Sequence, residues 1–138
     1  MDQLTVPARF ECLGQVRDFV RAEAQSAGLD PQAVYRLQLG VDELVSNTIE
    51  HGYASLECDK TIALAFKDED ACVKIILEDE GQAFDPRQYF SFNDVDTPFE
   101  ARRPGGFGIF LSINAIDELL YERDGERNRL ICVMKKGA

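Results

Sequence analysis

The chain has 138 residues, 45% of them hydrophobic, which suits one compact domain with its own core over residues 1–138. Acidic residues outnumber basic ones by 25 to 15, so the formal net charge is -10 at pH 7. This charge argues against a nucleic-acid partner, because binding to the phosphate backbone relies on basic side chains. An acidic surface can instead steer a basic protein partner, or it can serve solubility alone.

The cysteine and apolar patterns predict a protein of the reducing cytoplasm. The four cysteines are widely spaced without a C-x-x-C pair, so we expect buried free thiols. With a single histidine and no cysteine cluster, a zinc site has no support. No apolar run is long enough to span a bilayer and none follows Met1 as in a secretory signal, so neither a membrane partner nor secretion is expected.

The N-terminal part is predicted to form one strand and two helices. A short strand is expected over residues 3–6, at the edge of a sheet because a proline follows it. Apolar residues at helical spacing predict a helix over residues 11–27, closed by Gly28. Asp30, followed by a proline, is expected to cap a second helix that continues to about residue 51.

Two hairpins and a helix are expected in the rest of the chain. Residues 61–66 and 72–77 are predicted as antiparallel strands joined by a turn at 67–70. A helix is predicted over residues 108–120, followed by strands at about 119–122 and 129–135. The turn between those last strands is expected at Asp124-Gly125.

The order of these elements predicts an α+β fold. Two helices follow the first strand, and the remaining strands can pair with their neighbours in sequence. We expect a two-layer sandwich with helices on one face of a mixed, mostly antiparallel sheet. Residues 79–106 show little periodicity, and so long an irregular stretch in a small domain is typical of a functional loop.

Glu43 and Asn47 stand one turn apart on the second predicted helix. Leu37, Val41 and Leu44 mark the core-facing stripe of that helix. At about 100° per residue, Glu43 and Asn47 lie only about 40° apart and off the centre of the stripe. A carboxylate and an amide therefore face the same space, either as an ordinary solvated surface or as part of a site.

Asp79 and Gly81 directly follow the strand predicted at 72–77. A carboxylate at the end of a sheet can accept a hydrogen bond from an exocyclic amine, and a glycine allows a ligand to approach the backbone closely. The same residues are also common in plain turns. On its own, this segment supports either interpretation.

Gly105, Gly106 and Gly108 lie just ahead of the last predicted helix. Backbone N–H groups exposed by glycines, together with a helix N-terminus, form sites suited to phosphate. The segment is neither a Walker A loop nor a dinucleotide-binding fingerprint, because the residues and context that define those motifs are missing. Alone, it could equally be a hinge.

Together, the three segments resemble the histidine-kinase-like (Bergerat-fold, GHKL) ATPases, and within them the serine-protein kinase anti-sigma factors of bacterial partner-switching systems. The resemblance covers residues 35–135, including the tail at 117–130. The motifs that carry it are Glu43-x-x-x-Asn47 with His51-Gly-Tyr53, Asp79-x-Gly81 with Phe84-Asp-Pro86, and Gly105-Gly-x-Gly108-Ile-x-Leu111.

The resemblance implies a role for each motif. Asn47 would ligate Mg²⁺ through its side-chain oxygen, and Glu43 would be the general base that activates the attacking hydroxyl. Asp79 would accept a hydrogen bond from the adenine amine of ATP. The other expected nucleotide-binding residues are Gly81, Phe84, Gly105, Gly106 and Gly108, and residues 87–104 would form a lid over the nucleotide.

The same resemblance leads to our main functional hypothesis, an ATP-dependent serine/threonine kinase acting as an anti-sigma regulatory factor. It would phosphorylate an antagonist of the STAS type, sequester a sigma factor and form a homodimer. The alternative is a non-catalytic nucleotide-binding module that sequesters another protein, since Ala83 stands where many relatives carry Gly or Pro. A weaker possibility is the detached catalytic domain of a sensor histidine kinase.

Overall fold

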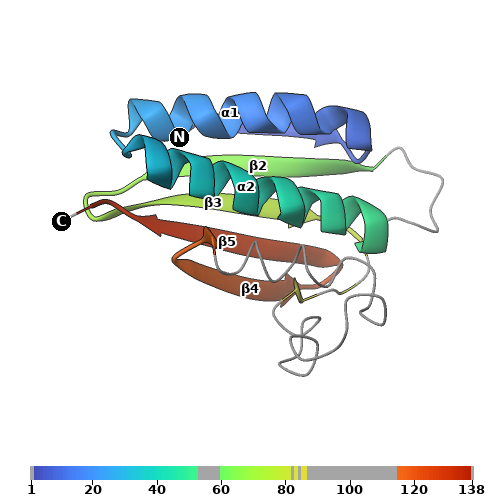
Figure 1. Ribbon diagram of the computed structural model, residues 1–138. Helices are drawn as coiled ribbons and strands as arrows, with labels where there is room; N and C mark the ends of the chain where they lie inside the picture. The colour runs from blue at the N-terminus through green and yellow to red at the C-terminus, as the bar shows by residue number, and fades with distance from the viewer. Residues whose placement is uncertain (1, 53–59, 82, 84, 87–114, 138) are drawn as a thin grey trace, which may run out of the picture.

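The computed structural model describes residues 2–52, 60–81, 83, 85–86 and 115–137 (Figure 1). A 3-10 turn at Phe10–Cys12 precedes the first helix, and a π-helical turn at Thr48–Gly52 extends the second. The helices and strands are β1 (Asp2–Pro7), α1 (Leu13–Ser26), α2 (Pro31–Asn47), β2 (Thr61–Asp68), β3 (Cys72–Asp79), β4 (Glu118–Asp124) and β5 (Arg127–Lys135).

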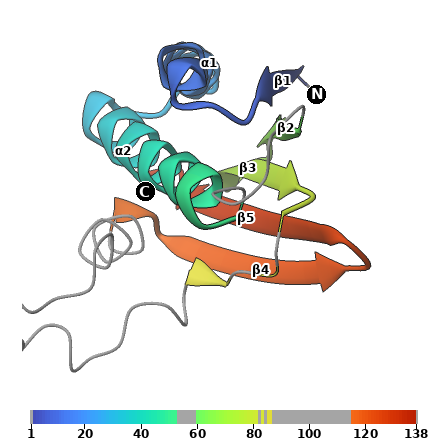
Figure 2. The ribbon, with the colours of Figure 1, turned by 90° about the vertical axis from the view of Figure 1, so that its right-hand side faces the viewer.

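The strands form one sheet in the order β1-β2-β3-β5-β4, and all four described pairings are antiparallel. Helices α1 and α2 lie side by side on one face of it (Figures 1 and 2). The expected α+β sandwich is therefore confirmed. β1 lies at the edge of the sheet, as predicted, and β3 pairs with β5 although β4 comes between them in the sequence.

Local sequence signals set the helix boundaries. Gly28 follows α1 with a φ of +88°, a conformation that favours glycine. The Asp30 carboxylate accepts a hydrogen bond of 2.8 Å from the Ala33 N–H at the start of α2. Both capping predictions are thus confirmed. The end of α2 differs from a plain α-helix, because its last turn is π-helical.

Other predicted boundaries are wrong by one to a few residues. The helix expected over 108–120 cannot extend beyond residue 117, because Glu118 begins β4 and pairs opposite Val133. The first hairpin turn is displaced toward the C-terminus because β2 continues to Asp68, opposite Val73. The first helix, expected from residue 11, begins with a 3-10 turn. Pairing between strands sets the start of β4 and the position of the β2–β3 turn, and local sequence patterns do not detect such pairing.

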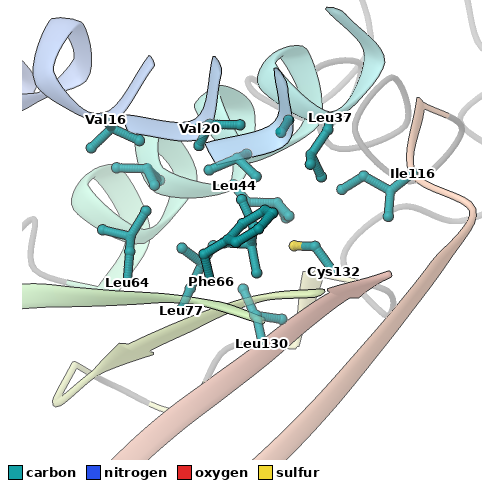
Figure 3. Close-up of a cluster of buried hydrophobic side chains, with 14 of the residues drawn as sticks. Val16, Val20, Leu37, Leu44, Leu64, Phe66, Leu77, Ile116, Leu130 and Cys132 are labelled. Carbon is teal, nitrogen blue, oxygen red and sulfur yellow. The ribbon is translucent and has the colours of Figure 1, made fainter. Parts of the chain in front are cut away.

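The core lies between the helices and the covered face of the sheet (Figure 3). Val16 and Val20 of α1 and Leu37 and Leu44 of α2 contribute from the helix layer, and Leu64 of β2 contributes from the sheet. All five side chains are buried. Cys12 and Cys132 are buried free thiols, as expected, whereas the free thiol of Cys72 is only partly buried and Cys58 lies outside the described residues. Burial raises the pKa of Cys132 to about 12.

Truncating Leu37 to alanine should reduce the free energy of unfolding by about 2–5 kcal/mol, because its side chain is fully buried at the centre of the core. Tyr35 provides the matched control on the same helix, since it is 64% exposed, and Tyr35→Ala should change the free energy little. Urea denaturation followed by circular dichroism measures both. Equal losses in the two variants would contradict this description of α2.

The opposite face of the sheet carries an apolar row across four strands. Ala65 is paired with Ile76, Ile76 with Ile131, and Ile131 with Leu120. Leu120 is among the exposed large hydrophobic residues. Neither described helix covers this face (Figure 2). No helix in the described part of the chain is long and apolar enough to cross a membrane.

Candidate functional site

Two of the predicted motifs meet at one end of the molecule. α2 ends at Asn47, β3 ends at Asp79, and both ends lie on the right in Figure 1. The chain therefore brings a helix motif and a strand motif, separated by about thirty residues of sequence, to the same end of the sandwich. Both termini lie at the opposite end.

Asn47 is the last residue of α2 and only 4% exposed. Its amide nitrogen Nδ2 donates a hydrogen bond of 2.8 Å to the carbonyl oxygen of Glu43, one turn earlier. This bond turns the nitrogen back onto the helix and leaves Oδ1 as the side-chain atom able to act as a ligand. An oxygen ligand is the kind that Mg²⁺ prefers, so the residue suits the predicted role.

The π-helical turn begins where three successive side chains bond back to the helix. The hydroxyls of Ser46 and Thr48 donate to the carbonyl oxygens of Asp42 and Leu44, on either side of the Asn47 bond. Bonds of this kind compete with backbone hydrogen bonding and bend helices. π-helical turns occur frequently at functional sites. The change in helix type thus coincides with the candidate magnesium ligand.

Glu43 lies on the same helix, partly buried. Partial burial raises the pKa of its carboxyl group, and the negative charge of Asp42 raises it further. Asp42 itself is paired with Arg17 of α1 at 2.8 Å. A carboxylate with a raised pKa is a better proton acceptor at neutral pH than an ordinary surface glutamate. The environment of Glu43 is consistent with a general base.

Asp79 is buried, with only 6% of its surface exposed, although it carries a carboxyl group. Its Oδ1 accepts hydrogen bonds from the Gly81 N–H at 2.8 Å and from Asn128 Nδ2 at 2.9 Å. Burial raises the pKa of Asp79, whereas the two hydrogen bonds and the nearby charge of Arg123 lower it and so partly offset the burial. A buried carboxylate anchored in this way is suited to accept a hydrogen bond from a ligand.

Asn128, Tyr121 and Arg123 complete this cluster. They belong to the tail at 117–130 that carries part of the resemblance, but no role was predicted for any of them. Asn128 of β5 lies directly opposite Asp79 of β3. The Tyr121 hydroxyl and Arg123 Nη1 both donate to Asn128 Oδ1, and Arg123 Nη1 also donates to the Gly81 carbonyl at 2.9 Å. A sequence signal existed: Asn128 occupies the same alternating phase of β5 as three buried apolar residues, Leu130, Cys132 and Met134.

Comparison with known proteins identifies the family. The family model for the histidine kinase-like ATPase domain matches residues 6–134. The chain belongs to this family. The resemblance indicated by the three motifs is thereby confirmed at the family level, and the fold places the Glu43–Asn47 helix and Asp79 at one end of the histidine kinase-like ATPase domain.

Named relatives of this ATPase domain include serine-protein kinases. Serine-protein kinase RsbW of Halalkalibacterium halodurans is 29% identical over 125 residues, covering 88% of this chain and 75% of the relative. Serine-protein kinase RsbW of Staphylococcus epidermidis is 27% identical over 139 residues, covering 97% of this chain and 87% of the relative.

Solved structures share the fold of this ATPase domain. The RsbU and RsbW domains of a Mycobacterium tuberculosis protein match with a TM-score of 0.62 at 17% identity, over all of this chain and 34% of that one. The histidine kinase domain of a blue-light activated kinase from Erythrobacter litoralis matches with a TM-score of 0.54 at 14% identity, over 94% of this chain and 61% of that one.

Several predicted site residues of the ATPase domain lie outside the described residues. They are Phe84, Gly105, Gly106 and Gly108, together with the expected lid at 87–104. Gly81 is described, and it is buried beside Asp79. The described part of the site thus comprises the expected base and magnesium ligand on α2 and the expected adenine-binding residues at the end of β3.

The raised pKa of Asp79 predicts a pH-dependent cost to folding. The folded protein holds the Asp79 proton more tightly than the unfolded chain, so stability falls as pH rises from the ordinary aspartate pKa through the raised one. Asp79→Asn removes this titration. The free energy of unfolding of the variant, relative to the unaltered protein, should therefore increase as pH is raised through that window.

Urea denaturation at a series of pH values between about 3.5 and 7, a range that begins near the ordinary aspartate pKa, measures this effect. Asp70→Asn is the control, because Asp70 lies in the exposed turn between β2 and β3. That variant should keep the pH dependence of the unaltered protein. A constant difference between Asp79→Asn and the unaltered protein across the pH range would contradict the raised pKa.

Proposed function

We propose that this protein is a Mg²⁺- and ATP-dependent serine/threonine kinase that acts as an anti-sigma regulatory factor. Its substrate would be an antagonist protein of the STAS type, and its alternative partner a sigma factor, which implies a cytoplasmic setting. The observation that carries the proposal is the partly buried Glu43 carboxylate one turn before Asn47, at the same end of the fold as buried Asp79. Relatives named as serine-protein kinases support it.

In this proposal, each described site residue has one task. Asn47 Oδ1 would hold Mg²⁺, which would neutralise charge on the phosphate oxygens. Asp79 would accept a hydrogen bond from the adenine amine, with Gly81 beside the base. Glu43 would accept the proton of the attacking serine or threonine hydroxyl and keep it at its carboxylate while the phosphoryl group is transferred.

Phosphotransfer to a candidate STAS-domain protein tests the proposal. The protein would be incubated with Mg²⁺, ATP and the antagonist, and the product analysed by mass spectrometry for phosphoserine or phosphothreonine. Transfer that requires Mg²⁺ and ATP is the expected result. ATP binding without transfer to any STAS protein encoded near its gene would instead favour the non-catalytic sequestering module. Phosphohistidine as the product would favour a histidine kinase domain.

We also propose that the protein forms a homodimer. β1 is an edge strand that pairs with β2 on one side, and the apolar row through Ile76 and Ile131 lies on the face away from α1 and α2. Edge strands are common sites of association, and so are apolar faces of a sheet such as this one, which neither described helix covers. Light scattering coupled to gel filtration should give about twice the mass of one chain, and the mass of a single chain would refute the dimer.

A further inference from the structure

The hydrogen bonds around Asn128 have a fixed direction. Its side-chain oxygen Oδ1 accepts from the Tyr121 hydroxyl and from Arg123 Nη1 at 3.1 Å. The guanidinium of Arg123 carries donors only, so the atom facing it must be an acceptor. The amide nitrogen is therefore turned the other way, and it donates to Asp79 Oδ1 at 2.9 Å and to the Gly81 carbonyl at 3.4 Å.

The orientation of the Asn128 side chain determines that a donor, and not an acceptor, faces Asp79. Oδ1 accepts from Asn128 Nδ2 and from the Gly81 N–H, so both described donors reach the same carboxylate oxygen. These two donors stabilise the negative charge of the ionised form, and any proton of the acid form is placed on Oδ2. Oδ2 is then left as the oxygen with which an ionised Asp79 can accept from a ligand. Arg123 also adds a positive charge that favours the carboxylate.

We propose that Asn128, oriented by Tyr121 and Arg123, is the positioning residue that keeps Asp79 an acceptor and so sets the preference for a purine bearing a 6-amino group. A 6-keto purine presents an oxygen at that position, which an ionised Asp79 repels. The proposal rests on the assignment of Asp79 to the adenine end of the nucleotide. Asn128 acts through Asp79 and touches no reacting atom.

The charged groups near Asp79 and Asn128 lie on both faces of the sheet. Tyr121 and Arg123 of β4 are the described titratable groups that bond to Asn128. Arg127 faces the other side of β5 from Asn128, where it lies 3.7 Å from Glu78 and 3.9 Å from Glu80. The titration of Asp79 is therefore governed mainly by its burial, Asn128, the Gly81 N–H and Arg123.

Asn128→Asp provides the sharpest test, because it exchanges the donor facing Asp79 for a carboxylate oxygen of nearly equal shape. Two carboxyl groups this close share one proton, and the pair loses that proton as pH rises. In the singly protonated pair, Asp79 Oδ2 can still accept from an amine. When both groups ionise, their repulsion disrupts the site.

ATP binding to the purified full chain is measured by calorimetry between about pH 5 and 8, because a carboxyl pair that shares a proton loses that proton in this range. Circular dichroism checks that each variant is folded. We expect ATP affinity of Asn128→Asp, relative to the unaltered protein, to fall about 10-fold or more as pH rises across this range, since one charged pair is worth at least that. Taking the ratio of the two dissociation constants cancels the titration of the nucleotide phosphates. The control is Glu122→Gln, on the other face of β4, which should keep the unaltered profile.

Tyr121→Phe is the second variant, and it keeps the test decisive if Asn128→Asp does not fold. It removes one donor to Asn128 Oδ1 with little change in packing. The ATP-to-GTP affinity ratio should fall about 3- to 10-fold, the effect of one hydrogen bond. GTP measured in parallel with ATP gives this ratio for every variant.

The outcomes separate this inference from the proposed function. If the unaltered protein does not bind ATP, the proposed function is overturned and this inference with it. If the unaltered protein binds ATP, the inference alone is overturned by an Asn128→Asp profile parallel to the unaltered one. It is equally overturned if folded Tyr121→Phe keeps the unaltered ATP-to-GTP ratio.

Discussion

Replacing Glu43 with alanine should lower the rate of phosphotransfer about 100- to 10,000-fold, the usual contribution of a general base. Affinity for ATP should change little, because Glu43 serves the attacking hydroxyl and not the nucleotide in the proposed mechanism. Its raised pKa, caused by partial burial and by Asp42, supports proton transfer at neutral pH. Single-turnover transfer and calorimetric titration with Mg²⁺ and ATP give the two quantities separately.

Glu43→Gln refines this test because it retains the size of the side chain and removes only its basicity. Glu50→Ala is the matched control: Glu50 is exposed on the π-helical turn that continues α2. It should transfer phosphate at the unaltered rate. An unchanged rate in Glu43→Ala would exclude Glu43 as the base, and loss of ATP binding in that variant would assign it to nucleotide binding instead.

Asp79→Asn should weaken ATP binding by about 10- to 100-fold, because a hydrogen bond to a charged group is lost and an N–H group is placed against the adenine amine. The oxygen of the new amide side chain can still accept from Gly81 and Asn128, so the fold of this corner is retained. The new N–H group can donate to a 6-keto purine, so the ATP-to-GTP affinity ratio should fall as well.

Calorimetric titration with ATP and GTP measures both changes. Asp70→Asn, in the exposed β2–β3 turn, should bind as the unaltered protein does. Unaltered ATP affinity in a folded Asp79→Asn protein would remove Asp79 from the nucleotide site. The free energy of unfolding of Asp79→Asn, relative to that of the unaltered protein, should also be higher at neutral pH than at acidic pH. The Asp79 carboxylate would therefore help ATP binding and, at neutral pH, reduce stability.

The sequence predicted the elements better than their ends. Helix α2 combines a capping Asp30, a proline at its first position and a clear apolar stripe, and all three signals agree. The start of β4 was obscured because Ile116 and Leu119 also fit helical spacing. Strand pairing sets the start of β4, because Glu118 pairs opposite Val133, and local periodicity does not reveal this partner.

The two halves of the candidate site also differed in how far the sequence could predict them. Glu43 and Asn47 could be placed together from sequence because a helix brings residues i and i+4 to one face. Asn128 could not be placed beside Asp79, because their contact depends on the register of β3 on β5, about fifty residues apart in the chain. The available signal was an asparagine at a strand position whose neighbours in the alternating pattern are buried. Its partner can be identified only when the pairing of the strands is known.

The pairing of β3 with β5 across the sequence has a consequence for how this protein can change over time. The chain that joins β3 to β4 closes a loop whose entropic cost grows only slowly, by about 0.6 kcal/mol for each doubling of length. A longer connection between these two strands would therefore add little to the entropic cost of closing the loop. The register of β3 on β5, which holds Asp79 opposite Asn128, need not change when the connection does. The length of the connection can thus change, by natural divergence or by protein engineering, while the contact between Asp79 and Asn128 is retained.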